Sequence, residues 1–434
     1  MGRISSVRDV AERHLCSGCG ACAYIDAQRI HMVDDARTGR RPMVNAVAGA
    51  EQDQGALAVC PGVQLEHTFD RRDPKLIHDL TDSWGPVYEV WEGHAADPEI
   101  RFAGSSGGAV SALALYCMEQ LGFHGVLHTA ARRNAPYLNH TVMSTTRAEI
   151  LERTGSRYSP ASPCDGLQMI EDAPGPCVFI GKPCDVAAAQ KARLLRPQLD
   201  ANMGLTIAFF CAGVPATQGT LDLLASVGVD DPSRIESLRY RGHGWPGRWT
   251  VRWRDGDNKR RESSLSYEES WTFLAQYRQW RCRICPDHTG EFADVAVGDA
   301  WHRPVQPDDA GNSLIVARTS RGRALLRSAG LHVTLVRSDP RLLEASQPGF
   351  PAGRGAVWGR LLGMALCGLR RPRYTGFSLY AGWRRRLRLG EKMRVTLGTV
   401  RRVWRLRLRR RMPVRGFGLP TDRLVRIGAP EHIP

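Results

Sequence analysis

The sequence of 434 residues contains no long apolar run. Its longest candidate, residues 361–369, is nine residues between Arg360 and Arg370, whereas a helix that spans a bilayer needs about 20 apolar residues. The first 14 residues carry charges throughout and include no apolar core of the signal-peptide kind. We therefore expect a cytoplasmic protein without a membrane span, in which the cysteines stay reduced.

Acidic residues are scarce relative to basic ones, with 44 Asp and Glu against 60 Lys and Arg, a net charge of +16. The excess is local, because residues 381–415 hold fourteen Lys or Arg and a single acid, Glu391. The remaining chain is nearly neutral, so the charge describes a C-terminal segment rather than the core.

The basic C-terminal segment mixes arginines with apolar residues, including Trp383 and Trp404. This composition suits contact with an anionic membrane surface, at the inner face of the membrane, or with an acidic partner. A solvated or disordered charged helix is the alternative interpretation. Nucleic-acid binding is not expected, since the segment contains no recognised nucleic-acid module.

The first cysteine set lies near the N-terminus. Cys16, Cys19 and Cys22 form C-x-x-C-G-x-C, and the remote Cys60 is followed by Pro61. Gaps of two residues let a tight loop turn three sulfurs inward, and a distant cysteine before proline commonly supplies the fourth ligand of a [4Fe-4S] cluster. The pattern therefore predicts a cluster, with a structural zinc site as the alternative.

A second set centres on Cys282 and Cys285 in C-R-I-C. Two further ligands must come from elsewhere, and Cys184 and Cys211 are the candidates because each follows an expected strand, where α/β folds place ligands. A metal-free redox C-x-x-C is the alternative. Packing roles are expected for the other cysteines, Cys117, Cys164, Cys177 and Cys367.

A glycine- and serine-rich segment precedes the helix expected from Ala109. Ser105, Ser106, Gly107 and Gly108 can bring backbone amides and hydroxyls close to an anion at the N-terminus of that helix. The segment suits the pyrophosphate of a dinucleotide. A helix cap with a flexible turn is the alternative.

A second short motif combines Ser156, Arg157 and Tyr158. The motif offers a cation for phosphate and an aromatic face for a ring system, although a surface turn would have the same composition. His243, in a G-H-G turn, and Tyr158 are candidates for proton delivery.

Between residues 84 and 340, expected helices alternate with short apolar runs, which predicts an α/β domain. The expected strands include 177–181, 205–210 and 313–318, and the expected helices include 109–121, 185–195 and 219–227. Residues 341–380 are rich in Pro, Gly and Arg and are expected to form a linker.

Seven motifs occur in a recognisable order: CSGCGAC, GSSGGAVSAL, GSRY, FIGKPCDVAAAQ, FFCAGVP, YRGHGWPG and CRICPDHTGEFADVAVGDAW. Together they resemble the beta-subunit family of coenzyme F-420 hydrogenases and dehydrogenases, which also includes 7-hydroxymethyl chlorophyll a reductase and divinyl chlorophyllide reductase. The resemblance covers about residues 12 to 330. It implies a mixed α/β or α+β chain with FAD and one or two [4Fe-4S] clusters, two being the expectation.

The resemblance also implies roles for residues. The GSSGG segment would hold FAD phosphates and Lys182 would lie near the flavin, while Arg157 stands where the family usually has lysine. Asp294 and Asp299 match acidic positions of the family. The expected parts are a ferredoxin-like iron-sulfur region over 1–75, a flavin-binding part over 84–165 and a part with the second cluster over 166–340. Composition, and not the resemblance, gives the linker over 341–380 and a basic helical tail over 381–434, since the residues beyond about 345 have no counterpart in the family pattern.

The function implied is that of an oxidoreductase that passes electrons between clusters and FAD. A ferredoxin-like protein would donate or accept the electrons, and a small-molecule substrate or deazaflavin coenzyme would be reduced or oxidised. The alternative is a non-catalytic electron-transfer subunit of a larger complex.

Overall fold

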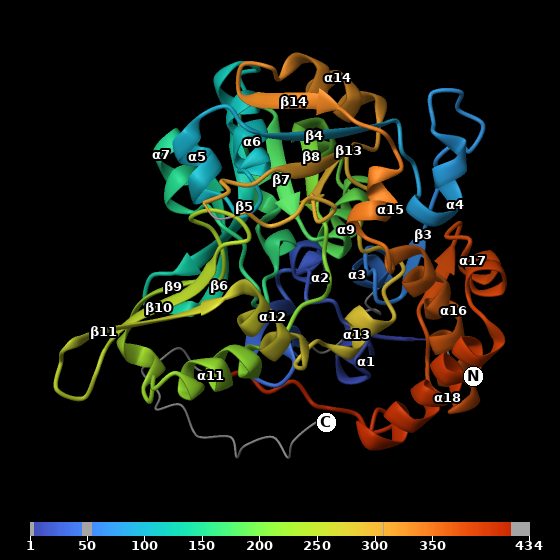
Figure 1. Cartoon of the computed structure of the whole chain (residues 1–434). Coiled ribbons are helices and arrows are strands. Elements are labelled where there is room, and N and C mark those ends of the chain that lie inside the picture. Colours follow the sequence, from blue (N-terminus) through green and yellow to red (C-terminus); the bar gives the residue numbers. More distant parts are fainter. Residues whose placement is uncertain (1–3, 46–53, 307, 418–434) are drawn as a thin grey trace.

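The computed structural model describes residues 4–45, 54–306 and 308–417. Its centre is an eight-stranded sheet in the order β14-β4-β13-β12-β8-β7-β5-β6 (Figure 1). The strands, in chain order, are β4 (Glu89–Ala95), β5 (Gly125–Arg132), β6 (Ala135–Ser144), β7 (Cys177–Gly181), β8 (Met203–Phe209), β12 (Val295–Asp299), β13 (Ser313–Ala317) and β14 (Val333–Arg337). This large mixed sheet confirms the expected mixed α/β class.

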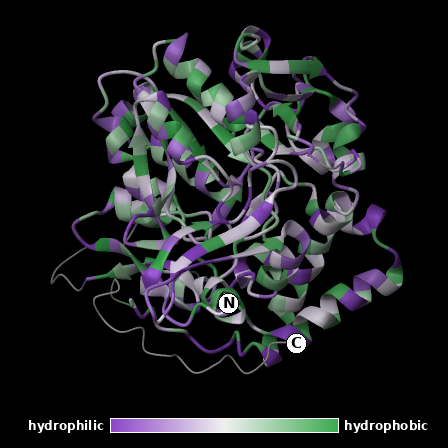
Figure 2. Cartoon of the chain, turned by 60° about the vertical axis from the view of Figure 1, so that its left-hand side comes forward, coloured by the Kyte–Doolittle hydropathy of each residue, from purple (hydrophilic) through white to green (hydrophobic). Residues whose placement is uncertain are grey.

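The four middle strands, β12, β8, β7 and β5, run parallel, while the outer strands pair antiparallel. Parallel strands need cover on both faces, and successive residues point to opposite faces. In β7, Val178 packs with the helices of one face and Phe179 belongs to the core on the other. Figure 2 shows hydrophobic residues along these inner strands. The carboxyl ends of the middle strands therefore share one edge of the sheet.

Three helices predicted from the sequence are present: α6 (Ala109–Glu119), α9 (Pro183–Arg193) and α11 (Thr217–Ser226). Helix α6 lies on one face of the sheet and α9 on the other (Figure 1). The other α-helices between residues 81 and 340 are α4 (Thr81–Trp84), α5 (Pro98–Ala103), α7 (Arg147–Glu152), α8 (Gln168–Glu171), α10 (Pro197–Asn202), α12 (Tyr267–Ala275), α13 (Trp280–Arg283) and α14 (Ser320–Ser328).

The N-terminal region lies beside α9 and is built from short elements. These are α1 (Val7–Glu12), α2 (Ala21–Ile25), an antiparallel hairpin of β1 (Ile30–Asp35) and β2 (Gly39–Val44), α3 (Gln54–Ala58) and β3 (Gln64–Glu66). Residues of α2 and α3 enter the hydrophobic cores shared with their neighbours. The ferredoxin-like character of this region stays a prediction.

A smaller antiparallel sheet, β11-β10-β9, projects from the other side of the molecule (Figure 1). Its strands are β9 (Ile235–Arg239), β10 (Arg248–Arg254) and β11 (Arg260–Ser266). Trp249 and Val251 of β10 are fully buried against α11, α12 and β6. This packing ties the smaller sheet to the central one through a shared core.

Residues 341–380 form ordered elements where the composition suggested a linker. They contain α15 (Leu342–Ser346), α16 (Phe350–Leu366) and β15 (Arg373–Thr375). Strand β15 pairs parallel with β3 of the N-terminal region. Proline at the start of α16 is compatible with a first helical turn, and its glycines serve helix packing, which composition alone cannot reveal.

The glycines of α16 face helices α17 (Leu379–Arg386) and α18 (Leu389–Arg405). A Cβ on Gly355 would lie 2.8 Å from the backbone of Gly382, and one on Gly363 would lie 2.8 Å from the carbonyl oxygen of Thr396. Small residues spaced by four therefore let the three helices approach closely. What resembled a flexible linker is a packing surface.

The basic C-terminal segment is helical over α17 and α18, as expected, and residues 418–434 of it lie outside the described part. Val403 of α18 and the following Leu408 are buried in a core with Leu15, Cys16 and Ile284. The segment is thus anchored to the N-terminal region and α13. Among the described residues no helix has the length and apolar character needed to cross a bilayer.

Replacing Gly363 by alanine is expected to lower the free energy of unfolding by about 1–3 kcal/mol, since the added methyl group meets backbone of α18. Gly353 of the same helix has open space around its Cβ position. Gly353→Ala should therefore raise stability by about 0.5–1 kcal/mol through helix propensity. Urea unfolding of both variants tests this packing, and equal effects would contradict it.

Candidate functional site

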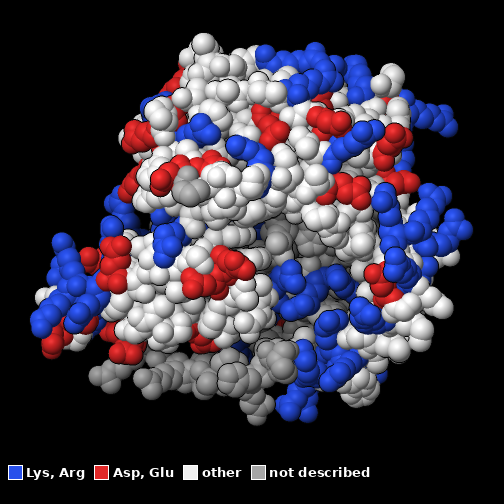
Figure 3. Space-filling view, viewed as in Figure 1, with Lys and Arg blue, Asp and Glu red and all other residues white. Residues whose placement is uncertain are grey.

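A cavity of about 680 Å³ opens at the carboxyl edge of the parallel strands. Loops after three of these strands contribute Lys182 after β7, Cys211 after β8 and Asp299 at the end of β12. This is where open α/β sheets bind ligands, and the volume lies in the usual range for ligand pockets. Figure 3 shows Lys and Arg side chains gathered in a hollow on one face of the molecule.

The GSSGG segment forms one wall of this cavity at the N-terminus of α6. Gly107 and Gly108 have φ of 70° and 68°, and a Cβ on Gly108 would lie 2.4 Å from the Ile100 carbonyl oxygen. Only glycine accepts both the conformation and the contact. Gly108 is the N-cap of α6 and no side chain caps the helix, so the first amides of the helix stay available to an anion.

The two serines of this segment are partly engaged. Ser105 Oγ accepts a hydrogen bond from the backbone N–H of Ser156 at 2.6 Å. Ser106 Oγ donates to the carbonyl oxygen of Asn312 at 3.1 Å. The first of these contacts joins the GSSGG segment to the second predicted cofactor motif, so Ser105 and Ser156 lie together on the cavity wall.

Arg157 lines the cavity, but its guanidinium is committed to the protein. It donates to Asn139 Oδ1 and to the backbone carbonyl oxygens of Pro136 and Leu238, and it lies over the ring of Tyr240 at 5.5 Å. Burial lowers the pKa of Arg157. These contacts give it a structural role here, and its contact with a cofactor stays a prediction.

Tyr158 is a half-buried residue of the cavity lining, within an aromatic and ionic group. Its hydroxyl accepts from Arg241 at 3.3 Å, and Arg241 forms a two-pronged ion pair with Asp299 at 2.7 and 2.9 Å. Trp245 Nε1 also donates to Asp299 at 2.9 Å. Burial raises the pKa of Tyr158, which keeps the hydroxyl protonated. Asp299 thus holds Arg241 beside a phenol that can give a proton.

The other sequence-predicted residues take different positions. Lys182 Nζ donates to Asp185 at 2.6 Å inside the cavity wall. Burial alone would lower the pKa of Lys182, but the Asp185 carboxylate outweighs it and keeps the ammonium charged. His243 has φ of 59°, stacks on Phe102 at 5.5 Å and is not among the residues that line this cavity.

Asp294 is bound within the fold instead of facing the cavity. Its carboxylate accepts from the N–H and the hydroxyl of Thr206, both at 2.9 Å, and from the hydroxyl of Thr319 at 2.7 Å. These bonds join β8 and β12 to the start of α14. A structural role therefore accounts for the acidic residue at position 294.

The first cysteine set gathers around the loop that joins α1 to α2. Burial raises the pKa of Cys22 well above its usual value, and neighbouring Cys19, Cys16 and Cys60 raise it further. Burial raises the pKa of Cys60 to about 12, with the nearby thiols of Cys19 and Cys16 contributing. Cys60, the ligand that depended on a single Cys-Pro pair, therefore lies with the other three thiols.

The second set gathers beside the cavity. Burial raises the pKa of Cys184, with Cys285 and Cys211 contributing, and burial raises that of Cys211 to about 12, with Cys282 and Cys285 contributing. Cys282 Sγ also accepts the backbone N–H of Val214 at 3.3 Å. The structure thus brings together the two cysteines after strands and the C-R-I-C pair.

No group of three or more His, Cys, Asp or Glu side chains in the described ranges is close enough to share a single metal ion. A mononuclear zinc site draws four ligands onto one ion, whereas a cubane cluster takes its thiolates at four separate corners.

Arg281 lies between the two cysteine sets. Its side chain is buried, and Nη2 donates to the carbonyl oxygen of Pro61, next to Cys60, at 3.0 Å. Its Nε and Nη1 have no hydrogen-bond partner among the described residues. Burial would lower the pKa of Arg281, but the Tyr374 phenol and the thiols of Cys285, Cys184 and Cys282 outweigh it.

Two residues near the cysteines were not predicted from the sequence as part of the site. Cys164, expected to be a packing residue, forms a side-chain contact with Cys19 that lowers the pKa of Cys19 to about 7. His288 Nδ1 lies 2.7 Å from the carbonyl oxygen of Cys211, and burial lowers the pKa of His288 to about 4. The sequence could have pointed to His288, because the motif CPDH places this histidine three residues after Cys285.

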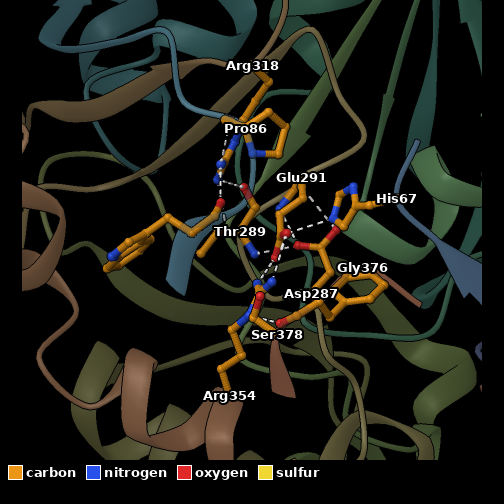
Figure 4. Close-up of polar contacts among 12 residues, drawn as sticks. His67, Pro86, Asp287, Thr289, Glu291, Arg318, Arg354, Gly376 and Ser378 are labelled. Carbon is orange, nitrogen blue, oxygen red and sulfur yellow. Dashed lines mark hydrogen bonds and ion pairs between the residues drawn. The ribbon is translucent and has the colours of Figure 1, made fainter. Parts of the chain in front are cut away.

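The loop after the second cysteine pair is held by a buried polar network (Figure 4). Asp287 accepts the backbone N–H groups of Thr289, Gly290 and Glu291 at 2.8–3.0 Å. Arg318 donates to the carbonyl oxygen and the hydroxyl of Thr289 at 3.0 and 2.9 Å. The loop therefore has a fixed shape before it enters β12.

Glu291 is the centre of this network. Its carboxylate forms a buried ion pair with Arg354 of α16 and lies 2.7 Å from His67 Nε2 (Figure 4). Burial alone would raise the pKa of Glu291, but Arg354 and His67 outweigh it and lower the pKa to about 2. The pair joins the cysteine loop to the C-terminal helices and to the N-terminal region.

Two family models, both for the coenzyme F420 hydrogenase/dehydrogenase beta subunit, match this chain. The model of the N-terminal part matches residues 90–168, and the model of the C-terminal part matches residues 176–338. One subunit of the F(420)H(2) dehydrogenase of Methanosarcina mazei is 24% identical over 349 residues, 79% of this chain and 88% of the relative.

Two further comparisons are weaker or shorter. The beta subunit of the F420-dependent formate dehydrogenase 1 of Methanococcus maripaludis is 24% identical over 245 residues, 56% of this chain and 59% of the relative. A chain of the F420-reducing [NiFe] hydrogenase complex from Methanosarcina barkeri is 18% identical, with a TM-score of 0.49 over 64% of this chain and 94% of that chain.

Glu291→Gln is expected to lower the free energy of unfolding by about 3–5 kcal/mol, because Arg354 would stay buried without its anion. The pKa of Glu291 is about 2, below its ordinary value of 4.5. Its stabilisation is thus present above pH 4.5 and is lost as the pH falls toward 2. The stability difference between wild type and variant should shrink over that range in urea unfolding.

Glu262→Gln is the matched control, because the ion pair of Glu262 with Arg252 is exposed. That substitution should change the free energy of unfolding by less than about 1 kcal/mol. A difference between wild type and Glu291→Gln that stays constant below pH 4.5 would contradict the assignment of the low pKa to Glu291.

Proposed function

Because this chain belongs to the coenzyme F420 hydrogenase/dehydrogenase beta-subunit family, we propose that it is an iron-sulfur flavoprotein oxidoreductase that passes electrons between [4Fe-4S] clusters and FAD. A small-molecule substrate or a deazaflavin coenzyme is the organic reactant, and a ferredoxin-like protein donates or accepts the electrons. One observation carries this proposal. The cavity lined by the GSSGG wall is also lined by Cys211 and Cys282 of the second cysteine set.

The two cysteine sets fit iron-sulfur clusters by their donor chemistry. Each set offers four neighbouring thiols, and the buried guanidinium of Arg281 lies beside both, with two nitrogens unpartnered among the described residues. A buried cation needs compensating negative charge, which cluster thiolates would provide. Cys16, Cys19, Cys22 and Cys60 would hold one cluster, and Cys184, Cys211, Cys282 and Cys285 the other.

The cavity wall fits the phosphates of FAD by its backbone. Gly107 and Gly108 keep the chain free of side-chain bulk, and the uncapped N-terminus of α6 favours negative charge. Ser105 and Ser106 would add hydroxyls to this cradle. A bound flavin supplies the exchange between one-electron and two-electron transfer that a cluster and an organic substrate require.

Polar side chains of the cavity are placed to deliver the proton that this reaction requires. Arg241 donates to the hydroxyl of Tyr158, and Asp299 fixes the position of Arg241. A phenol that receives a cationic hydrogen bond gives up its proton more readily, so Tyr158 would deliver a proton at its Oη. Lys182 keeps a positive charge on the cavity wall. To receive a proton from His243, a substrate would have to extend beyond the residues that line the cavity.

A non-catalytic electron-transfer subunit is the second candidate. The names of both sequence relatives describe subunits of larger dehydrogenases. Such a subunit would carry the same cofactors but would turn over an organic substrate only with its catalytic partner. Substrate-dependent reoxidation by the isolated chain therefore separates the two functions.

The central test is metal and flavin analysis after anaerobic purification. Wild type should contain about four irons for each cluster, with flavin absorbance, and Cys60→Ser should lose about half of the iron. Cys117→Ala is the matched control, because Cys117 is a buried core residue of α6 remote from both sets. Its iron content should equal that of wild type. Zinc in place of iron would overturn the proposal.

The surface of α18 allows a test of the proposed contact between the basic C-terminal segment and an anionic membrane surface. Leu389, Met393 and Leu397 are exposed on this helix, whereas Val403 anchors it. Met393→Ser/Leu397→Ser should thus reduce flotation with vesicles of anionic lipid without unfolding the helix. Arg394→Gln in the same assay separates charge from apolar contact. Equal recovery of wild type and the double-serine variant would contradict a membrane role.

A further inference from the structure

One end of the cavity is lined by four arginines that come from three separate parts of the chain. We name these residues the arginine cluster: Arg278, which precedes α13, Arg283 at the end of α13, Arg360 of α16 and Arg402 of α18. All four are half-buried. They lie beside Cys282, at the end of the cavity formed by the C-terminal helices.

No acidic residue in the described ranges forms an ion pair with any member of this cluster. Arg278 donates from Nη1 to the Ala212 carbonyl oxygen at 2.9 Å, while its buried Nε has no partner in the part of the chain that the structure describes. Arg360 donates from Nη1 to the Arg283 carbonyl oxygen at 2.6 Å. Most of the guanidinium donors are therefore left for a ligand.

The four cations also act on one another. Burial, together with the charges of Arg402, Arg278 and Arg283, lowers the pKa of Arg360 to about 10. Like charges held together in a half-buried wall raise the free energy of the empty site. A bound anion would remove that repulsion and would receive charge-assisted hydrogen bonds.

The other charged groups of the cavity do not offer this possibility. Arg241 is paired with Asp299, Arg354 with Glu291, Lys182 with Asp185 and Arg153 with Glu149. Arg157 has no acidic partner among the described residues, but its guanidinium donates to Asn139 Oδ1 and to two backbone carbonyl oxygens. The residues that line the whole cavity include nine Arg or Lys and two Asp. The surplus of positive charge is thus concentrated in the arginine cluster, away from the GSSGG wall.

We propose that the arginine cluster binds an anionic group, phosphate or carboxylate, of the small-molecule substrate that enters the cavity. The proposal rests on the proposed function only in calling that ligand the substrate. Arg360 and Arg402 lie outside the residues that match the family models, which end at residue 338. Two of the four arginines therefore come from the C-terminal helices, outside the part of the chain that matches the family models.

The test is calorimetric titration of the anaerobically purified full-length protein with inorganic pyrophosphate and, separately, with citrate at low ionic strength. Arg360→Gln/Arg402→Gln should weaken binding of the preferred probe by about tenfold for each lost charge-assisted contact. The preferred probe distinguishes a phosphate ligand from a carboxylate ligand. Flavin and iron contents are measured on each preparation.

The matched control is Arg394→Gln/Arg401→Gln, which removes two exposed charges from the same helix without touching the cavity. Its affinity should stay within about twofold of wild type, since screened surface charges contribute little. Arg402→Gln alone repeats the test with a change that disturbs no protein hydrogen bond of the described residues. Equal weakening in both double variants would reduce the effect to net charge and overturn the inference.

The remaining outcomes separate this inference from the proposed function. Unchanged affinity in Arg360→Gln/Arg402→Gln, or no binding of either probe to wild type, overturns the anion site even in a protein loaded with iron and flavin. Loss of transfer from a ferredoxin without loss of probe affinity would assign the arginines to an acidic protein partner and also overturn it. Arginine-dependent probe binding in a protein that lacks iron and flavin would keep the anion site and refute the proposed function.

Discussion

The buried ion pair between Glu291 and Arg354 is the constraint on which the arrangement of the chain depends. A carboxylate with no exposure needs a cation and hydrogen bonds in place of water, and α16 and His67 supply them. Because α16 must dock here, its later residue Arg360 is placed on the cavity wall. One interaction thereby couples the cysteine loop, the N-terminal region and the C-terminal helices.

Arg281 imposes the complementary constraint, that of a buried cation. It contacts the backbone beside Cys60 and lies near the thiols of the second set. No carboxylate forms an ion pair with it among the described residues. On the proposed function, cluster thiolates would supply the compensating negative charge, and Arg281 would be a counter-charge shared by the two cysteine sets.

Much of the fold could be predicted where the signal is local. The apolar run at 177–181 coincides with β7, and the helices expected near residues 109, 185 and 219 are α6, α9 and α11. Residues 341–380 could not be predicted, because Gly355 and Gly363 resemble linker glycines until their helical neighbours are known. Likewise the spacing of cysteines indicated ligand sets, whereas Arg281 and the arginine cluster depend on contacts between distant segments.

The boundary of the family match sharpens what the C-terminal segment contributes. The match to the family models ends at residue 338, yet Phe350, Arg360 and Arg402 line the same cavity as Lys182. The GSSGG cradle lies at the N-terminus of α6, apart from these helices, so side chains of the C-terminal wall can change without altering the cradle. On the proposed function, the C-terminal helices α16 and α18 would therefore help to set which organic molecule the cavity accepts.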